Sequence, residues 1–313
     1  MDGYSIVRKL RNLISEGSDS SWLDVKTSYD YIYEAIVATV GRVNLVTTTD
    51  DLTTVASTTS YNLNYNFLKL YMMDSQNRYF VKYYDGTSYY FIYHKPYDSI
   101  YLANNTTAVS IPDSFSIMDA TPLSRITGSA TSTAAISNGE ATLTSTTSDF
   151  SNAEPGDTIH NTTDTSHGVI ISKTSTTVLI TVLYDGTLNY WSSADAYIIV
   201  PAHRYKLILD PPPSTSSHTV TVPYVFKPDP VYSATIATGY RGYPIPDDYE
   251  PGIIKYAAWL YKYRDREPQY ADSLYKYWDD DLRKKAKGSN DALRRKGYRV
   301  NFLKSASESG SSR

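Results

Sequence analysis

The side chains best suited to hold a metal ion lie in one short stretch, HNTTDTSHG, which contains His160, Asp164 and His167. Imidazole nitrogens and carboxylate oxygens are ligands for several transition metals. The intervals between these residues match none of the common metal-binding motifs, and the stretch is rich in Ser and Thr. The sequence therefore favours a solvated loop here, and it predicts neither a metal nor a cofactor.

Acidic residues do not indicate a catalytic centre either. Glu140 and Glu154 could be paired as in a glycosidase, but nothing in the sequence distinguishes them from other carboxylates. The aspartates at 279–281 come late in an expected helix, just before a basic stretch, so we expect a solvated helix face. The chain has no nucleophile-elbow, phosphate-loop or dinucleotide-binding motif. We therefore predict that the protein is not an enzyme.

Tyrosine is unusually abundant, with 31 residues in a chain of 313. Only three of them lie between Pro122 and Val200. Tyrosine suits subunit interfaces because it offers a large, rigid contact area with a polar tip. It also has a high strand propensity, so both interpretations stay open. Tyr190 and Trp191 could form a sugar-binding platform, although a hairpin or core position is the favoured interpretation.

Charge is divided along the chain. Residues 241–313 hold 16 basic and 11 acidic residues, a net charge of +5, whereas the remaining residues carry −8. A basic C-terminal end on an acidic body is typical of an interaction tail. Nucleic acid and an acidic protein surface are both possible partners for such a tail.

The elements that must position these residues are helices at both ends and strands between them. Apolar residues recur at helical spacing in 4–15 and 27–43, and Thr27 with Asp30 resembles a capping box. Two further helices are expected from about residue 247, the second of them beginning at Pro268.

Strands are indicated by strict alternation in SYNLNYNF and by RYFVKYYDGTSYYFIY, a hairpin that turns at Asp85-Gly86. Residues 99–118 continue as short strands, and five to seven strands are expected in 122–200. The runs HRYKLILD and HTVTVPYVF are expected to pair across PPPSTSS as another hairpin.

Together these patterns predict an α+β fold. Helical N- and C-terminal segments would pack as a helical bundle with a β-rich region, and an all-β barrel or sandwich domain would be inserted. The adaptor-like core would comprise residues 1–121 and 202–290, the inserted β-domain 122–201, and a C-terminal arm 291–313. The absence of cysteine suits a reducing cytoplasm, and no signal sequence or membrane-spanning stretch is present, so we expect a soluble protein.

The order of the motifs resembles the head-to-tail adaptor (connector or neck) proteins of tailed bacteriophages. The resemblance covers roughly residues 5–121 and 202–290, and the block 122–200 departs from it. Another departure is LNYNF, which lacks the proline usual in this family after Y-x-L. The matching motifs are Tyr61-Asn62-Leu63, Leu207 to Pro213, Val222 to Pro228, Ile245-Pro246 and Ala257-Ala258.

The resemblance implies a structural role in the virion. Such adaptors usually form rings of twelve copies beneath the portal, lengthen the DNA channel and provide the site where tail or nozzle proteins attach. They are assembled in the cytoplasm of the bacterial host and reside in the neck between capsid and tail. Double-stranded DNA passes through without specific recognition, which suits an acidic body that makes few phosphate contacts.

The resemblance also implies which residues make the contacts. The C-terminal segment threads into the portal, and the paired helices form the ring against it. The expected arm residues are Tyr298, Arg299, Val300, Phe302 and Leu303. The expected ring and portal residues on the helices are Tyr256, Trp259, Tyr263, Tyr270 and Tyr277.

Two other functions stay open. The chain could be a tail or baseplate component that displays a host-glycan-binding β-domain within 122–200. It could also bind DNA through the basic segment 283–304, although that segment has few aromatic residues for base stacking. No contact with a membrane is expected.

Overall fold

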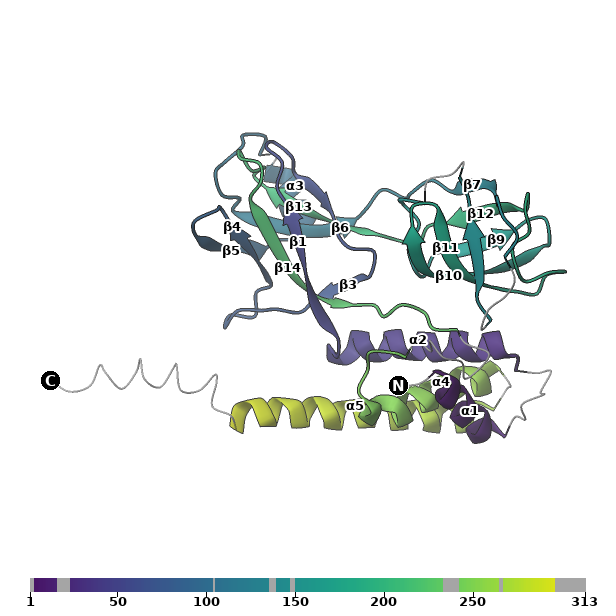
Figure 1. Ribbon diagram of the computed structural model, residues 1–313. Coiled ribbons are helices and arrows are strands. Elements are labelled where there is room, and N and C mark those ends of the chain that lie inside the picture. Colours follow the sequence, from purple (N-terminus) through teal and green to yellow (C-terminus); the bar gives the residue numbers. More distant parts are fainter. Residues whose placement is uncertain are drawn as a thin grey trace.

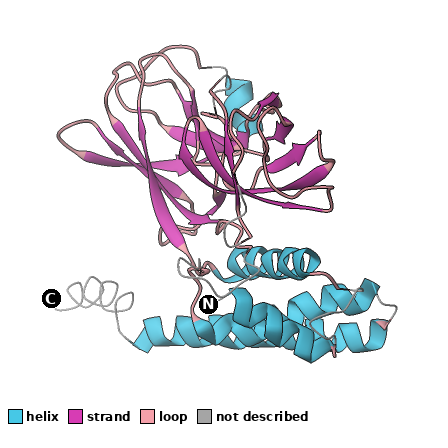
Figure 2. Ribbon diagram, turned by 45° about the vertical axis from the view of Figure 1, so that its right-hand side comes forward, coloured by secondary structure: helices cyan, strands magenta, loops and turns pink. Residues whose placement is uncertain are grey.

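The computed structural model describes residues 3–15, 23–103, 105–134, 139–146, 150–232, 242–264 and 267–295. Two β-sheets lie side by side above a layer of helices (Figure 1). The same division is visible from a second direction, with the strands on one side and most of the helices on the other (Figure 2). The helices of the described residues are α1 (Gly3–Ile14), α2 (Val25–Val43), α3 (Tyr97–Ala103), η1 (Asp247–Tyr249, a 3-10 turn), α4 (Glu250–Arg264) and α5 (Pro268–Arg295).

Helix α2 is the element that connects the helical layer to the sheets. Its N-cap is Asp24, whose carboxylate accepts a hydrogen bond from the Thr27 amide at 2.6 Å. The predicted capping box, in which Thr27 would be the N-cap and Asp30 would accept from the Thr27 amide, is therefore wrong. The N-cap is Asp24, and its carboxylate already accepts a hydrogen bond from the Thr27 amide. The helix continues through Gly41 and ends at Val43, where Asn44 adopts a left-handed conformation.

The first sheet has eight strands and draws on two distant parts of the chain. Its order is β1-β14-β4-β5-β6-β13-β2, with β3 also paired to β14, and only the β5–β6 pair is parallel. The strands are β1 (Thr47–Thr53), β2 (Ser60–Asn62), β3 (Phe67–Leu70), β4 (Phe80–Tyr84), β5 (Tyr89–His94), β6 (Ser114–Asp119), β13 (Tyr205–Asp210) and β14 (Thr219–Phe226).

The second sheet has six antiparallel strands in the order β7-β12-β9-β10-β11-β8. All of them fall between residues 126 and 200, so the chain leaves the first sheet after β6 and returns to it at β13. The strands are β7 (Ile126–Ser129), β8 (Ala141–Thr144), β9 (Thr158–Asn161), β10 (Ser166–Ser175), β11 (Val178–Tyr184) and β12 (Ala196–Val200).

Local strand predictions had mixed outcomes. The hairpin that turns at Asp85-Gly86 is confirmed as β4 and β5. The stretch SYNLNYNF is not one strand, because the chain turns between β2 and β3. Residues 99–118 contain the end of α3 as well as strand β6. The predicted pairing of β13 with β14 is wrong, since β13 lies between β6 and β2 and both of its edges are occupied.

The predicted fold class is also wrong. The structure is mostly β, with two large curled sheets and only 27% helix, so a helical bundle does not dominate it. Each sheet has a hydrophobic core of its own. The helices do not form an independent bundle either, because Ile171, Val182 and Val225 from the sheets share their core. Amphipathic patterns located the helices, but they carried no information on how much apolar surface the strands bury among themselves.

Within the described residues, no helix combines the length and apolar character needed to cross a lipid bilayer.

Candidate functional site: a tyrosine surface on the C-terminal helices

Helices α4 and α5 form an antiparallel pair on the side of α2 that faces away from the sheets (Figure 1). On α5 the buried residues recur at intervals of three and four, which keeps one stripe of the helix against its neighbours. This stripe consists of Ala271, Leu274, Trp278 and Leu282. The opposite side of the helix is therefore left to solvent.

An aromatic cluster joins the two helices. Tyr256 and Trp259 of α4 pack against Tyr275 and Trp278 of α5, with ring centroids 4.6–6.2 Å apart. The Trp278 indole donates a hydrogen bond to the Thr39 hydroxyl on α2 at 3.0 Å. Burial raises the pKa of the Tyr256 hydroxyl, and Glu34 and Tyr275 add to that shift. The cluster therefore fixes the rotation of α4 and α5 relative to α2.

Several large aromatic side chains of α4 and α5, including Tyr275 of this cluster, are exposed to solvent. Tyr263 is 61% exposed, Tyr270 42% and Tyr277 45%, and Tyr275 is partly exposed as well. Tyr270 and Tyr277 are seven residues apart, which places them on the same side of α5. We call these four residues the tyrosine surface. A rigid surface of this composition is typical of protein interfaces, in which tyrosine is enriched.

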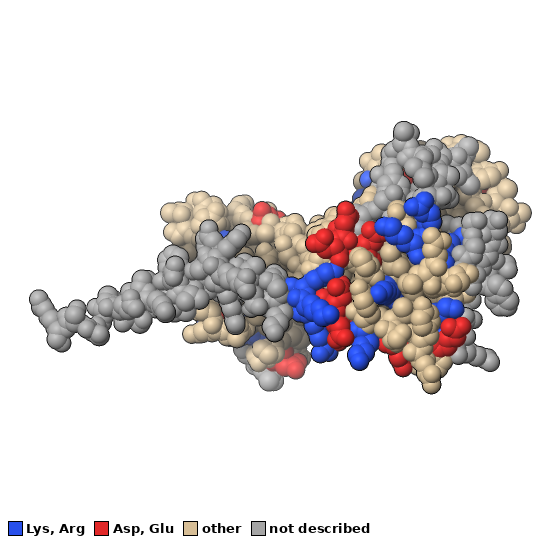
Figure 3. All heavy atoms as spheres, turned by 90° about the horizontal axis from the view of Figure 1, so that it is seen from below, with Lys and Arg blue, Asp and Glu red and all other residues tan. Residues whose placement is uncertain are grey.

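A band of opposite charges crosses the helical layer beside the tyrosine surface. Lys9 pairs with Glu250 at 2.6 Å, and Asp279 pairs with both Arg42 at 2.9 Å and Arg283 at 2.6 Å. Figure 3 shows a block of Lys and Arg next to a block of Asp and Glu on this face. The expectation of a freely solvated acidic run at 279–281 is therefore wrong for Asp279, which is only 15% exposed and links α2 to α5.

The structure places the predicted helix residues in two environments. Tyr256 and Trp259 are half-buried within the aromatic cluster, whereas Tyr263, Tyr270 and Tyr277 are exposed. The predicted arm, which consists of Tyr298, Arg299, Val300, Phe302 and Leu303, lies outside the described residues.

The other candidate sites do not assemble. His160 and His167 are cross-strand neighbours on β9 and β10, with ring centroids 6.4 Å apart, so they belong to a hairpin and not to a loop as expected. Asp164 does not complete a site with them: it accepts a hydrogen bond from Asn161, and His167 contacts Lys26 of α2. No group of three potential ligands is close enough to hold a metal in the part of the chain that the structure describes.

The core position, one of the two favoured interpretations of Trp191, is confirmed, because this side chain is fully buried, and the sugar-platform alternative is wrong for it. Its indole donates a hydrogen bond to the Thr181 hydroxyl at 2.9 Å inside the second sheet. Its ring also packs edge-on against Tyr197. A side chain in this position cannot stack on a sugar in solution.

Sequence patterns did not indicate how the second sheet, through His167, and the segment after β14, through Tyr232, are attached to α2. The Lys26 ammonium donates a hydrogen bond to His167 Nε2 at 2.6 Å, and the Tyr232 hydroxyl donates to Asp30 at 2.6 Å. Burial raises the pKa of Tyr232 and of Tyr184, and the negative charge of Asp30 raises both further. The contacts join residues more than 140 positions apart, so no local pattern could have indicated them.

Neither protein-family models nor curated protein sequences give a match to this chain.

Proposed function

We propose that the chain is a structural head-to-tail adaptor of a tailed bacteriophage. It forms a ring below the portal, dodecameric as the resemblance implies, extends the DNA channel and provides the attachment site for tail or nozzle proteins. The observation that carries the proposal is the tyrosine surface on α4 and α5. These helices are the elements through which adaptors of the resembling family contact their neighbours.

The arrangement of layers supports this role. The tyrosine surface belongs to helices on the far side of α2, so it can contact another subunit or the portal without disturbing either sheet (Figure 1). The aromatic cluster beneath it holds the surface rigid, which lowers the entropy lost on association. The ion pairs of Asp279 and Glu250 keep α1, α2, α4 and α5 in one fixed layer.

Native mass spectrometry and negative-stain imaging test the proposal. The purified chain is examined alone and after mixing with the portal protein of its phage. We expect closed rings or a stoichiometric portal complex. A monomer in both samples would refute the adaptor function.

Matched variants locate the contact. The double variant Tyr270→Ser/Tyr277→Ser should lose most ring or portal association, because each substitution removes an exposed aromatic contact. The control is Tyr101→Ser, which removes a tyrosine that is 71% exposed on α3, far from these helices. A chain truncated after residue 296 tests the basic arm separately, and it should stay folded but bind the portal weakly or not at all.

A further inference from the structure

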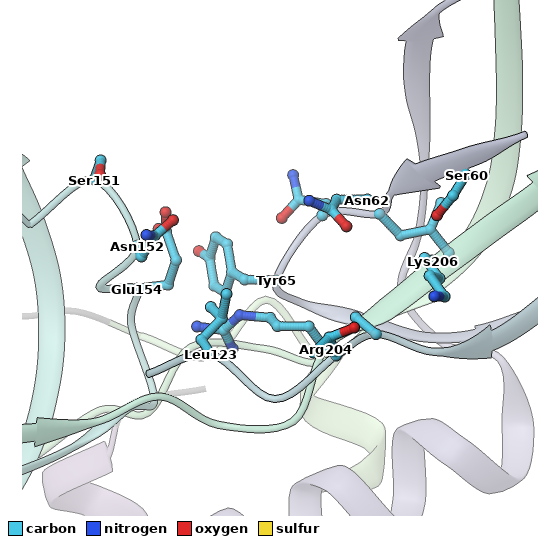
Figure 4. Close-up of a pocket in the computed structure, with 13 residues that line it drawn as sticks. Ser60, Asn62, Tyr65, Leu123, Ser151, Asn152, Glu154, Arg204 and Lys206 are labelled. Carbon is cyan, nitrogen blue, oxygen red and sulfur yellow. The ribbon is translucent and has the colours of Figure 1, made fainter. Parts of the chain in front are cut away.

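A cleft of about 630 Å³ lies between the two sheets, a volume within the range of ligand-binding pockets. One wall is the outer face of the β2–β13 pair, and the other is the loop that precedes β9. Figure 4 shows Asn62 and Lys206 on the first wall and Asn152 and Glu154 on the second, with Tyr65 between them. A ligand in this cleft would contact both sheets at once.

One buried carboxylate fixes the distance between the walls. Asp157, just before β9, is fully buried, and its two oxygens bind Arg204, just before β13, at 2.8 and 3.0 Å. Asp157 also accepts hydrogen bonds from the backbone amides of Ala202 and Glu154, at 2.8 Å each. The same side chain therefore holds the loop of one wall and the strand of the other. Because the cleft is in place before a ligand arrives, less free energy is lost on binding.

Two charged residues of the lining keep unused hydrogen-bonding groups. Arg204 binds Asp157 through one nitrogen, Nη2, and its Nε and Nη1 groups donate to no other described residue. The Arg204 side chain is only 10% exposed and lines the cleft, so these donors are accessible from there. Glu154 binds the Lys173 ammonium through Oε1 at 2.5 Å, which leaves Oε2 as an acceptor. The cleft therefore offers a ligand both donors and an acceptor.

The remaining polar side chains add amides and one uncompensated charge. Asn62 and Asn152 each carry a donor beside an acceptor, and neither side chain makes a hydrogen bond within the residues that the structure describes. Lys206 lies directly opposite Asn62 on the neighbouring strand, so the two side chains are adjacent. Lys206 makes no ion pair in the described part of the chain, whereas the other two charged residues of the lining are paired. The cleft therefore carries one positive charge that a ligand can neutralise.

This combination of groups favours a sugar over other small ligands. Sugar hydroxyls both donate and accept, so they match neighbouring amides and a carboxylate. Sugar rings also present C–H groups, which the negative face of an aromatic ring attracts. Tyr65 supplies such a ring, and its hydroxyl is anchored to both oxygens of Asp229 at 3.0 and 3.2 Å. A phosphate would fit less well, because its oxygens only accept and Glu154 would repel them.

We propose that the cleft binds an acidic saccharide, a short sugar chain that carries carboxylates. Asn62, Asn152 and Glu154 bind its hydroxyls from the two walls. Tyr65 packs against a sugar ring, and Lys206 pairs with a carboxylate. The site lies between the sheets and is separate from the sugar platform considered within the second sheet. The inference does not depend on the adaptor function.

Isothermal titration calorimetry of the full-length chain with oligosaccharides tests the proposal. The acidic probes are short oligomers of galacturonate, of hyaluronate and of sialic acid, and the neutral probes are galactose and glucose oligomers of similar length. We expect at least one acidic probe to bind saturably, about tenfold or more tightly than the neutral probes. Its binding should weaken as salt is added, because a charge pair contributes to it.

Matched variants locate the site. Lys206→Gln removes the uncompensated charge and should weaken binding of the acidic probe about tenfold. The control is Lys82→Gln, at an exposed lysine on β4 of the same sheet, and it should bind like the unmodified protein. Asn152→Ala changes an exposed residue on the opposite wall and should weaken binding about fivefold, as the loss of one or two hydrogen bonds would. Thermal unfolding checks that each variant is folded.

Any of four results would overturn the proposal. They are no binding of any acidic probe at millimolar concentration, equal affinity for acidic and neutral probes, equal effects of Lys206→Gln and Lys82→Gln, and unchanged binding in Asn152→Ala. Failure of the portal experiment above would not bear on this outcome, because the titrations contain no other protein.

Discussion

Removal of Arg204 should destabilise the protein far more than removal of an exposed arginine. Arg204→Met keeps the length of the side chain but leaves the Asp157 carboxylate, which is 0% exposed, without its cation. Breaking a buried pair in this way costs about 3–5 kcal/mol of the free energy of unfolding. The Glu154 and Ala202 amides still donate to Asp157 at 2.8 Å each, so we expect the lower end, about 3 kcal/mol.

Urea denaturation followed by circular dichroism measures this loss. The control is Arg283→Met, which breaks the ion pair with Asp279 at a position where the arginine is 69% exposed. Exposed pairs of this spacing contribute about 0.5 kcal/mol or less. Adding Asp157→Asn to Arg204→Met should restore part of the stability, because it removes the uncompensated charge. Similar losses in the Arg204 and Arg283 variants would refute a special contribution of the buried Arg204–Asp157 ion pair to stability.

Three further outcomes are expected. Trp191→Phe should lower the melting temperature in thermal unfolding, at a cost of about 2 kcal/mol, because a buried hydrogen bond is lost and a void is left. Trp278→Ala should cost about 3–5 kcal/mol in urea denaturation, whereas Tyr277→Ala should change stability by about 0.5 kcal/mol or less, since only Trp278 is buried. Above pH about 10 stability should fall, because Tyr232 has a raised pKa in the folded state and loses its proton more readily in the unfolded chain. In Tyr232→Phe, urea denaturation at pH 8 and 11 should show a smaller difference than in the unmodified protein.

The second sheet packs against the rest of the protein through apolar and aromatic side chains. Ile171 and Val182 of this sheet belong to the same core as the helices, and Tyr184 packs against Tyr232. If residues 126–200 were excised, this part of the helical core would be exposed to water. If the same residues were produced alone, Ile171 and Val182 would be exposed instead. Each of these truncated proteins should be less soluble than the complete chain.

Local sequence patterns predicted several elements correctly because their causes are local. The β4–β5 hairpin follows from Asp85-Gly86, where Gly86 adopts φ 96° and the Asp85 carboxylate accepts hydrogen bonds from Thr87 and Ser88. Helix α5 begins at Pro268, a residue suited to the first turn. In both cases the side chains that decide the structure lie within a few positions of one another.

Predictions failed wherever two distant segments competed for the same partner. Strand β13 was expected to pair with β14, which follows it in the sequence, but β6 and β2 occupy its two edges. Alternation of apolar residues shows that a strand exists, but it does not identify the strand beside it.

From the sequence alone, the abundance of tyrosine, the basic C-terminal end and the helical periodicity of α4 and α5 could be established. These features depend only on composition and on spacing within one element. Tertiary structure alone decided which tyrosines are exposed, that Arg204 binds Asp157, and that β13 lies between β6 and β2. The physical reason is that burial and pairing are properties of the folded chain, in which residues far apart in sequence exclude water from one another.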